Sequence, residues 1–258
     1  MPPGSGDVSV RSRLKRRTNE RAPEILARKL DERGKLPGPI INLLSRSQQA
    51  KVASISTLLD YQRGGITIFS EGEDAHFVYF VDAGVVRISR YSESGRRQVL
   101  AFMMPGDLFG IPDSGIYLNS SSTVCPSTLY RIPWQRLRAL LLREPDLQLN
   151  LLVKVAFDFR QAQRQILILG QQNISQRLAS LLMDFIQNPE FYDPKKKTLF
   201  FPISRPDIGD YIGSAPETVA RAFSRLENLG LLRRISSRLI EIKDPLALRS
   251  VLTGRRRS

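Results

Sequence analysis

Cysteine and histidine are almost absent from this chain of 258 residues, which contains one of each, Cys125 and His76. A single cysteine cannot form an internal disulfide, and these two residues cannot supply the ligands of an ordinary zinc or iron–sulfur site. We therefore expect no metal and no cofactor. Two interpretations of Cys125 stay open, a buried small apolar residue and a redox-sensitive thiol.

Long apolar runs are also missing. No stretch of about eighteen or more apolar residues occurs, and the N-terminus opens with Pro, Gly and Ser rather than with a basic patch and an apolar segment. We expect a cytoplasmic protein with no membrane contact. The chain has no G-x-x-x-x-G-K-[ST] loop, no G-x-S-x-G elbow and no histidine-centred triad, so the sequence predicts no enzyme.

Acidic residues are few beside the basic ones, 25 against 39, which gives a formal net charge of +14. Such a chain attracts polyanions, either nucleic acid or an anionic membrane, and charge alone does not choose between them. The length suits two compact domains and a connector.

Residues 1–38 hold several Pro and Gly residues and few bulky apolar ones, together with a basic run from Arg11 to Arg17. This composition cannot form a packed core and predicts a flexible basic arm. The arm is either a solvated tail or a segment that adds sequence-independent attraction to phosphates.

Residues 39–144 contain short β-rich runs separated by glycine-rich turns at near-regular intervals. The clearest runs are Ile66–Phe69, Phe77–Val81, Val85–Ile88 and Gln98–Phe102. This spacing is typical of an antiparallel meander or barrel rather than of βαβ units.

Residues 145–188 show a helical pattern, with a second amphipathic helix from Ile174 to Ile186. The first helix would span roughly 40 Å, more than one face of a small barrel can cover. Its apolar positions predict a parallel dimer helix, with burial inside its own subunit as the alternative. These positions are Leu151, Val155, Ala162, Ile166 and Leu169.

Residues 189–258 carry the sharpest local signals. Ser204, Pro206 and Asp207 form a helix-start pattern, and Ser214, Pro216 and Glu217 repeat it ten residues later. Gly213 ends the first helix, Gly209 allows close packing, and an apolar seam joins the two helices, formed by Ile208, Ile212, Val219 and Phe223. Two short strands around Ser236 and Ser237 then predict the wing of a winged helix-turn-helix.

The second helix of this motif must present side chains to the major groove of double-stranded DNA. Arginine can bond guanine, glutamate can accept from cytosine, and an alanine methyl can touch a thymine methyl. We therefore expect base contacts from Glu217, Ala220 and Arg221. Helix capping by Glu217 and a surface ion pair between Glu217 and Arg221 are the alternatives. Phosphate contacts are expected from Ser204, Arg205, Thr218, Arg225 and Arg238.

The order of these parts resembles the bacterial family of the cAMP receptor protein and the fumarate-and-nitrate-reduction regulator (the Crp/Fnr family). It looks most like the FixK-type branch, which lacks an iron–sulfur cluster. The resemblance covers about residues 40 to 250, and its most specific motif is E-T-V-x-R, on Glu217, Thr218, Val219 and Arg221. Further matching segments are Gly65–Gly72, Gly84–Arg87, Pro105–Gly110 and Ile203–Gly213.

The resemblance implies an α+β architecture with an N-terminal double-stranded β-roll, a long dimerisation helix and a C-terminal winged helix-turn-helix. It implies a homodimeric transcription regulator that binds a palindrome with TGA-like half-sites and has RNA polymerase as a partner. Ala220 stands where many relatives carry serine, so the resemblance leaves the outer base of the half-site open.

Cyclic-nucleotide-binding members carry a Gly-Glu pair and an Arg-Ser or Arg-Thr pair where this chain has Gly110 with Ile111 and Asn119 with Ser120. An anionic phosphate without an arginine partner binds poorly, so we expect a regulator that does not depend on cAMP. Haem-binding members use a cysteine or histidine on the roll, and His76 is the lone histidine, with a surface turn as the alternative. A small-molecule-gated receptor and a non-specific basic architectural protein remain rival hypotheses.

Overall fold

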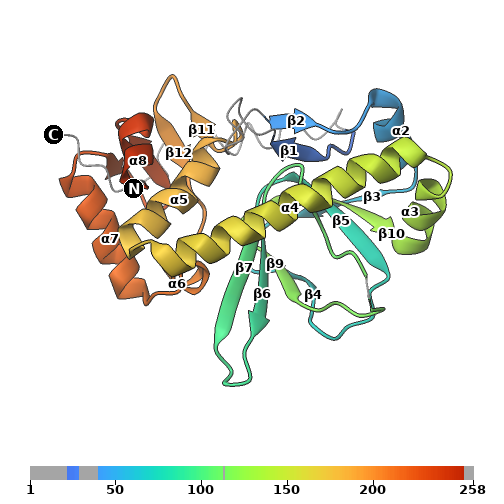
Figure 1. Cartoon of the computed structure of the whole chain (residues 1–258), viewed down its shortest axis with the longest axis horizontal. Coiled ribbons are helices and arrows are strands. Elements are labelled where there is room, and N and C mark those ends of the chain that lie inside the picture. The colour runs from blue at the N-terminus through green and yellow to red at the C-terminus, as the bar shows by residue number, and fades with distance from the viewer. Residues whose placement is uncertain (1–21, 29–39, 113, 253–258) are drawn as a thin grey trace. The chain divides into compact units, whose positions relative to one another are not determined.

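The computed structural model of the chain describes residues 22–28, 40–112 and 114–252 (Figure 1). The chain divides into two compact units at Ala162 and Gln163. Helix α4 (Pro145–Gln171) begins in the first unit and ends in the second. None of the helices in these described ranges combines the length and apolarity of a membrane span.

The first unit contains a β-roll of two four-stranded antiparallel sheets. One sheet has the strand order β3 (Thr57–Tyr61), β10 (Ser127–Pro133), β5 (Phe77–Ala83) and β8 (Leu108–Phe109). The other has the order β4 (Thr67–Phe69), β9 (Ser120–Thr123), β6 (Val86–Tyr91) and β7 (Arg97–Met103). Turn glycines with positive φ, such as Gly84 and Gly95, link neighbouring strands, which confirms the barrel-like architecture predicted from their spacing.

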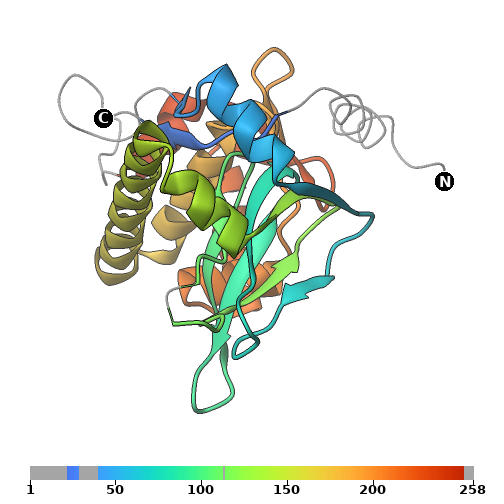
Figure 2. The ribbon, with the colours of Figure 1, turned by 90° about the vertical axis from the view of Figure 1, so that its right-hand side faces the viewer.

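Two short helices, α2 (Arg46–Ser54) and α3 (Trp134–Leu141), lie beside each other on the roll (Figure 2). They share one hydrophobic cluster with the start of α4, through Val52, Leu137 and Leu147. The roll therefore fixes the first turns of α4 by apolar burial.

The flexible arm expected over residues 1–38 requires a correction where the structure describes it. Strand β1 (Leu26–Arg28) pairs with β2 (Ile40–Asn42), and Ile25 is buried in the same cluster as Val52. The Leu26 side chain packs on Gly106, where any Cβ would collide with it. Pairing with β2 and the apolar contacts of Ile25 and Leu26 anchor this short segment on the roll. Residues 1–21 and 29–39 lie outside the described residues.

The second unit contains α5 (Ile174–Ile186), α6 (Arg205–Ile212), α7 (Pro216–Asn228) and α8 (Pro245–Val251). Its sheet has the strand order β11 (Tyr192–Asp193), β12 (Thr198–Phe200), β14 (Leu239–Ile242) and β13 (Leu232–Arg234). Phe185 of α5 contacts the rings of Phe191 and Phe201, and Phe201 contacts Phe223 of α7. Helix α5 therefore shares its core with α7, although the sequence grouped it with α4.

Candidate nucleic-acid interface

The helix-turn-helix begins as the sequence predicts. The Ser204 hydroxyl accepts a hydrogen bond from the Asp207 backbone at 3.2 Å, and α6 ends at Gly213 with a φ of 70°. A side chain at Gly209 would collide with the Ser214 carbonyl, so glycine permits the close turn between α6 and α7. The predicted apolar seam is fully buried in Ile208, Ile212, Val219 and Phe223.

The start of α7 differs from the prediction. Ala215, not Ser214, is the N-cap, and no side chain caps the helix. The Ser214 N–H donates to the Gly209 carbonyl, so the turn itself uses this residue. Pro216 at the first helical position has no N–H, so one fewer donor at the start of α7 lacks a partner. Glu217 then takes no part in a capping box.

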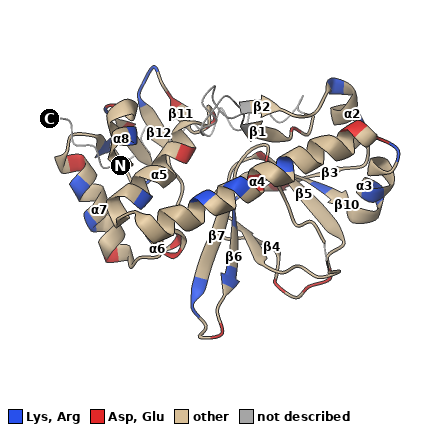
Figure 3. Cartoon of the chain, in the orientation of Figure 1, with Lys and Arg blue, Asp and Glu red and all other residues tan. Residues whose placement is uncertain are grey.

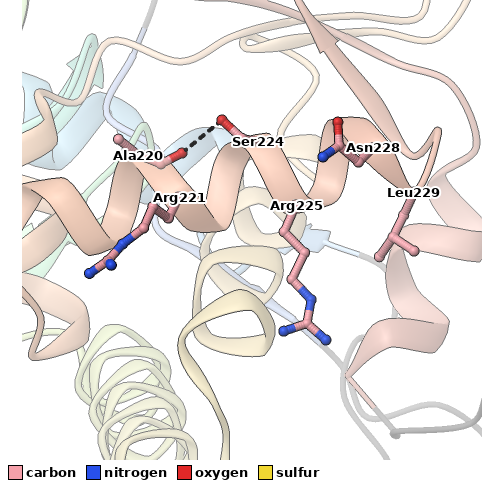
Figure 4. Close-up of a pocket in the computed structure, with 6 residues that line it drawn as sticks. All are labelled: Ala220, Arg221, Ser224, Arg225, Asn228 and Leu229. Atoms are coloured by element: carbon pink, nitrogen blue, oxygen red, sulfur yellow. Dashed lines mark hydrogen bonds between the residues drawn. The ribbon is translucent and has the colours of Figure 1, made fainter.

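Helix α7 carries several acidic and basic residues (Figure 3), and those on one of its faces are exposed. Glu217, Arg221 and Arg225 are exposed, and Ala220 is half-buried beside them. Arg221 donates to the Thr218 hydroxyl at 3.0 Å rather than to Glu217, so the surface ion pair considered as an alternative does not form. Figure 4 shows Arg221 and Arg225 extending from the same side of the helix along a shallow pocket. This face can meet a polyanion without first breaking an ion pair at Arg221.

Two of the expected phosphate-binding residues already have partners within the helix-turn-helix, one in α6 and one in α7. The Ser204 hydroxyl donates to the Asp207 carboxylate at 2.9 Å, so its proton is already in use. The Arg205 guanidinium lies 3.6 Å from the centroid of the Phe223 ring. Partial burial, with a smaller effect of Arg234, lowers the pKa of Arg205. These contacts hold Arg205 against α7.

The wing carries several arginines that differ in their partners. Arg234 donates through its backbone and side chain to Glu227 of α7, both at 2.8 Å, and this contact lowers the pKa of Glu227. Arg233 donates to Glu241 at 2.7 Å. Within the described residues the structure records no ion pair for Arg238, which lies at the exposed turn between β13 and β14. Sequence reasoning missed that Glu227 ties the wing to α7.

Helix α4 exposes an apolar stripe. Leu152, Phe159 and Ile166 are 63%, 63% and 70% exposed and recur every seventh residue, with Val155 and Ala162 between them. Three of the five expected dimer positions, Val155, Ala162 and Ile166, lie on this stripe. Leu151 instead packs on the roll, and Leu169 lies close to Gly213 in the same chain. A heptad count from Leu152 would have found Phe159.

Aromatic rings fill the interior of the roll. Phe69 stacks on Tyr117 at 3.7 Å between ring centroids, and Tyr79 and Phe109 pack around them. Burial, followed by the effect of Tyr117, raises the pKa of the Tyr79 phenol. Ile111 is exposed, and Asn119 and Ser120 carry no charge. These residues do not fit an anionic cyclic nucleotide.

The two residues considered for redox or haem chemistry lie in different surroundings. Cys125 is 1% exposed between β9 and β10, which favours the packing interpretation. The His76 side chain is 73% exposed, 4.0 Å from the Asp74 carboxylate, which favours the surface interpretation.

Two family models match the chain. Residues 60–144 match a cyclic nucleotide-binding domain, and residues 176–251 match a Crp-like helix-turn-helix domain. The matches cover the roll and the candidate interface separately.

Named relatives span most of the chain. It is 33% identical over 199 residues to the nitrogen fixation regulation protein FixK of Azorhizobium caulinodans, covering 77% of this chain and 80% of that protein. It is 27% identical over 192 residues to the transcriptional activator protein FnrA of Stutzerimonas stutzeri, covering 74% and 78%. The solved structure of FixK2 from Bradyrhizobium japonicum superposes with a TM-score of 0.70 at 28% identity, over 76% of this chain and 96% of that one.

The relatives are transcription regulators and not enzymes, and the α+β architecture agrees with theirs. Since similarity to FixK extends through both the roll and the helix-turn-helix, the chain belongs to the Crp/Fnr family of transcription regulators.

Proposed function

We propose that the protein is a homodimeric regulator that binds a palindromic DNA site with TGA-like half-sites, without a cyclic nucleotide. The observation that carries this proposal is the exposed face of α7. Glu217 and Arg221 both lie on this face, one helical turn apart. RNA polymerase is the expected protein partner, and the cytoplasm, where DNA is accessible, the expected place of action.

The exposed stripe of α4 supports the homodimer. An apolar surface of this length is unfavourable in water, and a second copy supplies a matching stripe through a two-fold axis. The seven-residue recurrence of Leu152, Phe159 and Ile166 is typical of a parallel coiled coil. Such a dimer would hold two copies of α7 roughly 34 Å apart, one turn of DNA.

The charged face of α7 supports sequence-specific binding. We assign base contacts to Glu217, Ala220 and Arg221, since an arginine and a glutamate one helical turn apart can bond guanine and cytosine edges. We assign phosphate contacts to five surrounding residues, namely Ser204, Arg205, Thr218, Arg225 and Arg238. Of these, Arg225 and Arg238 are exposed and need the least rearrangement.

The filled interior of the roll supports activity without a small ligand. A bound nucleotide would have to displace the Phe69 and Tyr117 stack, and would then leave its phosphate beside Asn119 and Ser120. Both steps are costly.

The test is selection of binding sites from random duplex DNA with the purified protein, without added ligand, at near-physiological salt. We expect a palindrome with TGA-like half-sites. A motif that appears only after cell extract is added would indicate a small-molecule-gated receptor instead. Binding with steep salt dependence and no motif would indicate a non-specific architectural protein.

A further inference from the structure

One arginine side chain joins the C-terminal ends of two helices in the second unit. From α5, Arg177 donates through Nε to the Gln172 carbonyl at 2.8 Å and through Nη2 to the Leu169 carbonyl at 2.7 Å. Through Nη1 it also donates to the Ile212 carbonyl at 2.9 Å. Leu169 lies in the last turn of α4, Gln172 directly follows that helix, and Ile212 is the last residue of α6.

The chemistry of helix ends explains why an arginine stands here. The last carbonyls of a helix have no partner within the helix and carry a partial negative charge. A guanidinium presents several donors in a fixed planar fork, so one side chain can serve carbonyls of two helices, whereas a lysine acts as a point charge. Gly213 follows Ile212 in the left-handed conformation that ends α6, with a φ of 70°, and the guanidinium lies beside it.

Two further contacts hold the same end of α4. Arg164 donates to both oxygens of the Asp184 carboxylate, at 2.9 and 3.0 Å, which joins α4 to α5. The Gln165 side-chain amide donates to the Tyr211 carbonyl at 3.2 Å, which joins α4 to α6. The last turns of α4 therefore pack with the helix-turn-helix as one body, upstream of the α4–α5 connection at Gln172 and Asn173.

We propose that Arg177 is a positioning residue that fixes the orientation of α7 relative to the end of α4, and thereby sets the spacing between half-sites that the dimer accepts. Helix α6 transmits the position to α7 through the close contact of Gly209 and Ser214. Arg177 touches no DNA in this scheme, and it leaves the choice of bases to α7. The inference rests on the proposed dimeric DNA binding.

The experiment compares Arg177→Gln and Arg177→Lys with the control Arg249→Gln, which removes the same charge from an exposed position on α8. Affinity is measured for duplexes that carry two selected half-sites, with their separation changed by one or two base pairs in either direction. Wild type should prefer one separation by more than about tenfold.

Arg177→Gln should bind the preferred site about tenfold more weakly and lose most of the spacing preference, because charge-assisted hydrogen bonds to helix ends are lost. Its base preference within each half-site should not change. The affinity and spacing preference of Arg177→Lys should lie between those of wild type and Arg177→Gln. Arg249→Gln should keep the wild-type spacing profile. An unchanged spacing profile in Arg177→Gln overturns the inference; if that variant does not fold, Arg177→Lys carries the same comparison.

Hydrogen exchange without DNA separates this inference from the proposed function. Amides at the ends of both helices, such as those of Gln172 and Ser214, should exchange at least about tenfold faster in Arg177→Gln than in wild type or Arg249→Gln. Equal exchange rates overturn the inference even if a palindrome is bound. If Arg177→Gln exchanges faster but the wild-type protein selects no DNA site, the contact of Arg177 with α4 and α6 is supported and the proposed function is wrong.

Discussion

The two units of the chain expose opposite kinds of surface. In the first unit α4 presents large apolar side chains to solvent, among them Leu149, Leu152 and Phe159. In the second unit α7 presents Glu217, Arg221 and Arg225. An apolar stripe gains most from a second apolar surface, whereas open cationic side chains gain most from phosphates and base edges. This difference supports the proposal that α4 mediates dimerisation and that α7 recognises DNA.

The units also differ in how they treat buried polar groups. The first buries the Lys154 ammonium against α4 and the roll, 2.7 Å from Asp107 and 2.8 Å from Asp158. Burial opposes the charge of Lys154, but the two carboxylates outweigh it and hold its pKa above the ordinary value. The second unit uses arginines such as Arg177 at helix ends. Within each unit these contacts hold the local part of α4, to the roll in the first unit and to α5 and α6 in the second.

The largest effect is expected when the apolar stripe is charged. Phe159→Glu should weaken dimerisation by more than about 100-fold, because each dimer would bury two carboxylates without partners at a central hot spot. DNA affinity should fall with it. Sedimentation equilibrium measures the first effect. The matched control is Leu142→Glu, which places the same charge at a leucine that is 72% exposed and lies outside α4. A similar loss of dimer in Leu142→Glu would contradict the proposed role of the α4 stripe.

The next effect concerns the stability of the roll. Phe69 is 5% exposed, and Phe69→Ala should lower the free energy of unfolding by about 3 to 4 kcal/mol, because the loss of the ring leaves a cavity beside Tyr117. Site selection at low temperature should recover the same motif if, as proposed, the aromatic interior stabilises the roll and does not control DNA binding. Leu58→Ala, at an exposed position on β3, should change stability by less than about 0.5 kcal/mol. A changed motif in Phe69→Ala would favour the ligand-gated alternative.

A smaller effect is expected on the recognition side. Arg221→Ala should cost about 1 to 3 kcal/mol of binding free energy and relax preference at one G·C pair. Arg238→Ala should instead weaken all sequences alike and reduce the dependence of log affinity on log salt by about one unit. Fluorescence anisotropy over a set of single-base variants and salt concentrations separates the two outcomes. Equal profiles for both variants would contradict the division into base and phosphate contacts.

Local signals explain why much of the fold and site could be predicted from sequence. Ser204 begins α6 and Gly213 ends it, both through capping contacts with residues close in sequence. Ser214 is not the N-cap of α7, because its N–H belongs to the C-terminal turn of α6 and donates to the Gly209 carbonyl. Adjacent leucines, Leu151 and Leu152, leave the phase of the α4 stripe ambiguous until the roll buries one of them. Strand β1 was missed because three residues carry too little pattern to stand out.

The smallest effect concerns pH and tests how α4 meets the roll. Burial, against the attraction of Lys154 and with repulsion from Asp107, raises the pKa of Asp158 from 3.8 to about 6. Between these values the folded chain holds more protons than the unfolded chain, so stability should fall as pH rises through this window. The side chain is 46% exposed, and water should limit the loss to about 1 kcal/mol or less.

Carboxyl resonances of Asp158 followed by NMR should titrate near pH 6, and Asp158→Asn should remove the fall in stability. Asp146→Asn removes an exposed carboxylate from the first turn of the same helix and should leave the fall in place. A titration of Asp158 near pH 4 would mean that water reaches its carboxylate, and α4 would then pack more loosely on the roll near Lys154. A midpoint near 6 would mean that the first unit holds α4 through a buried charge cluster, in contrast with the arginine fork that holds its other end.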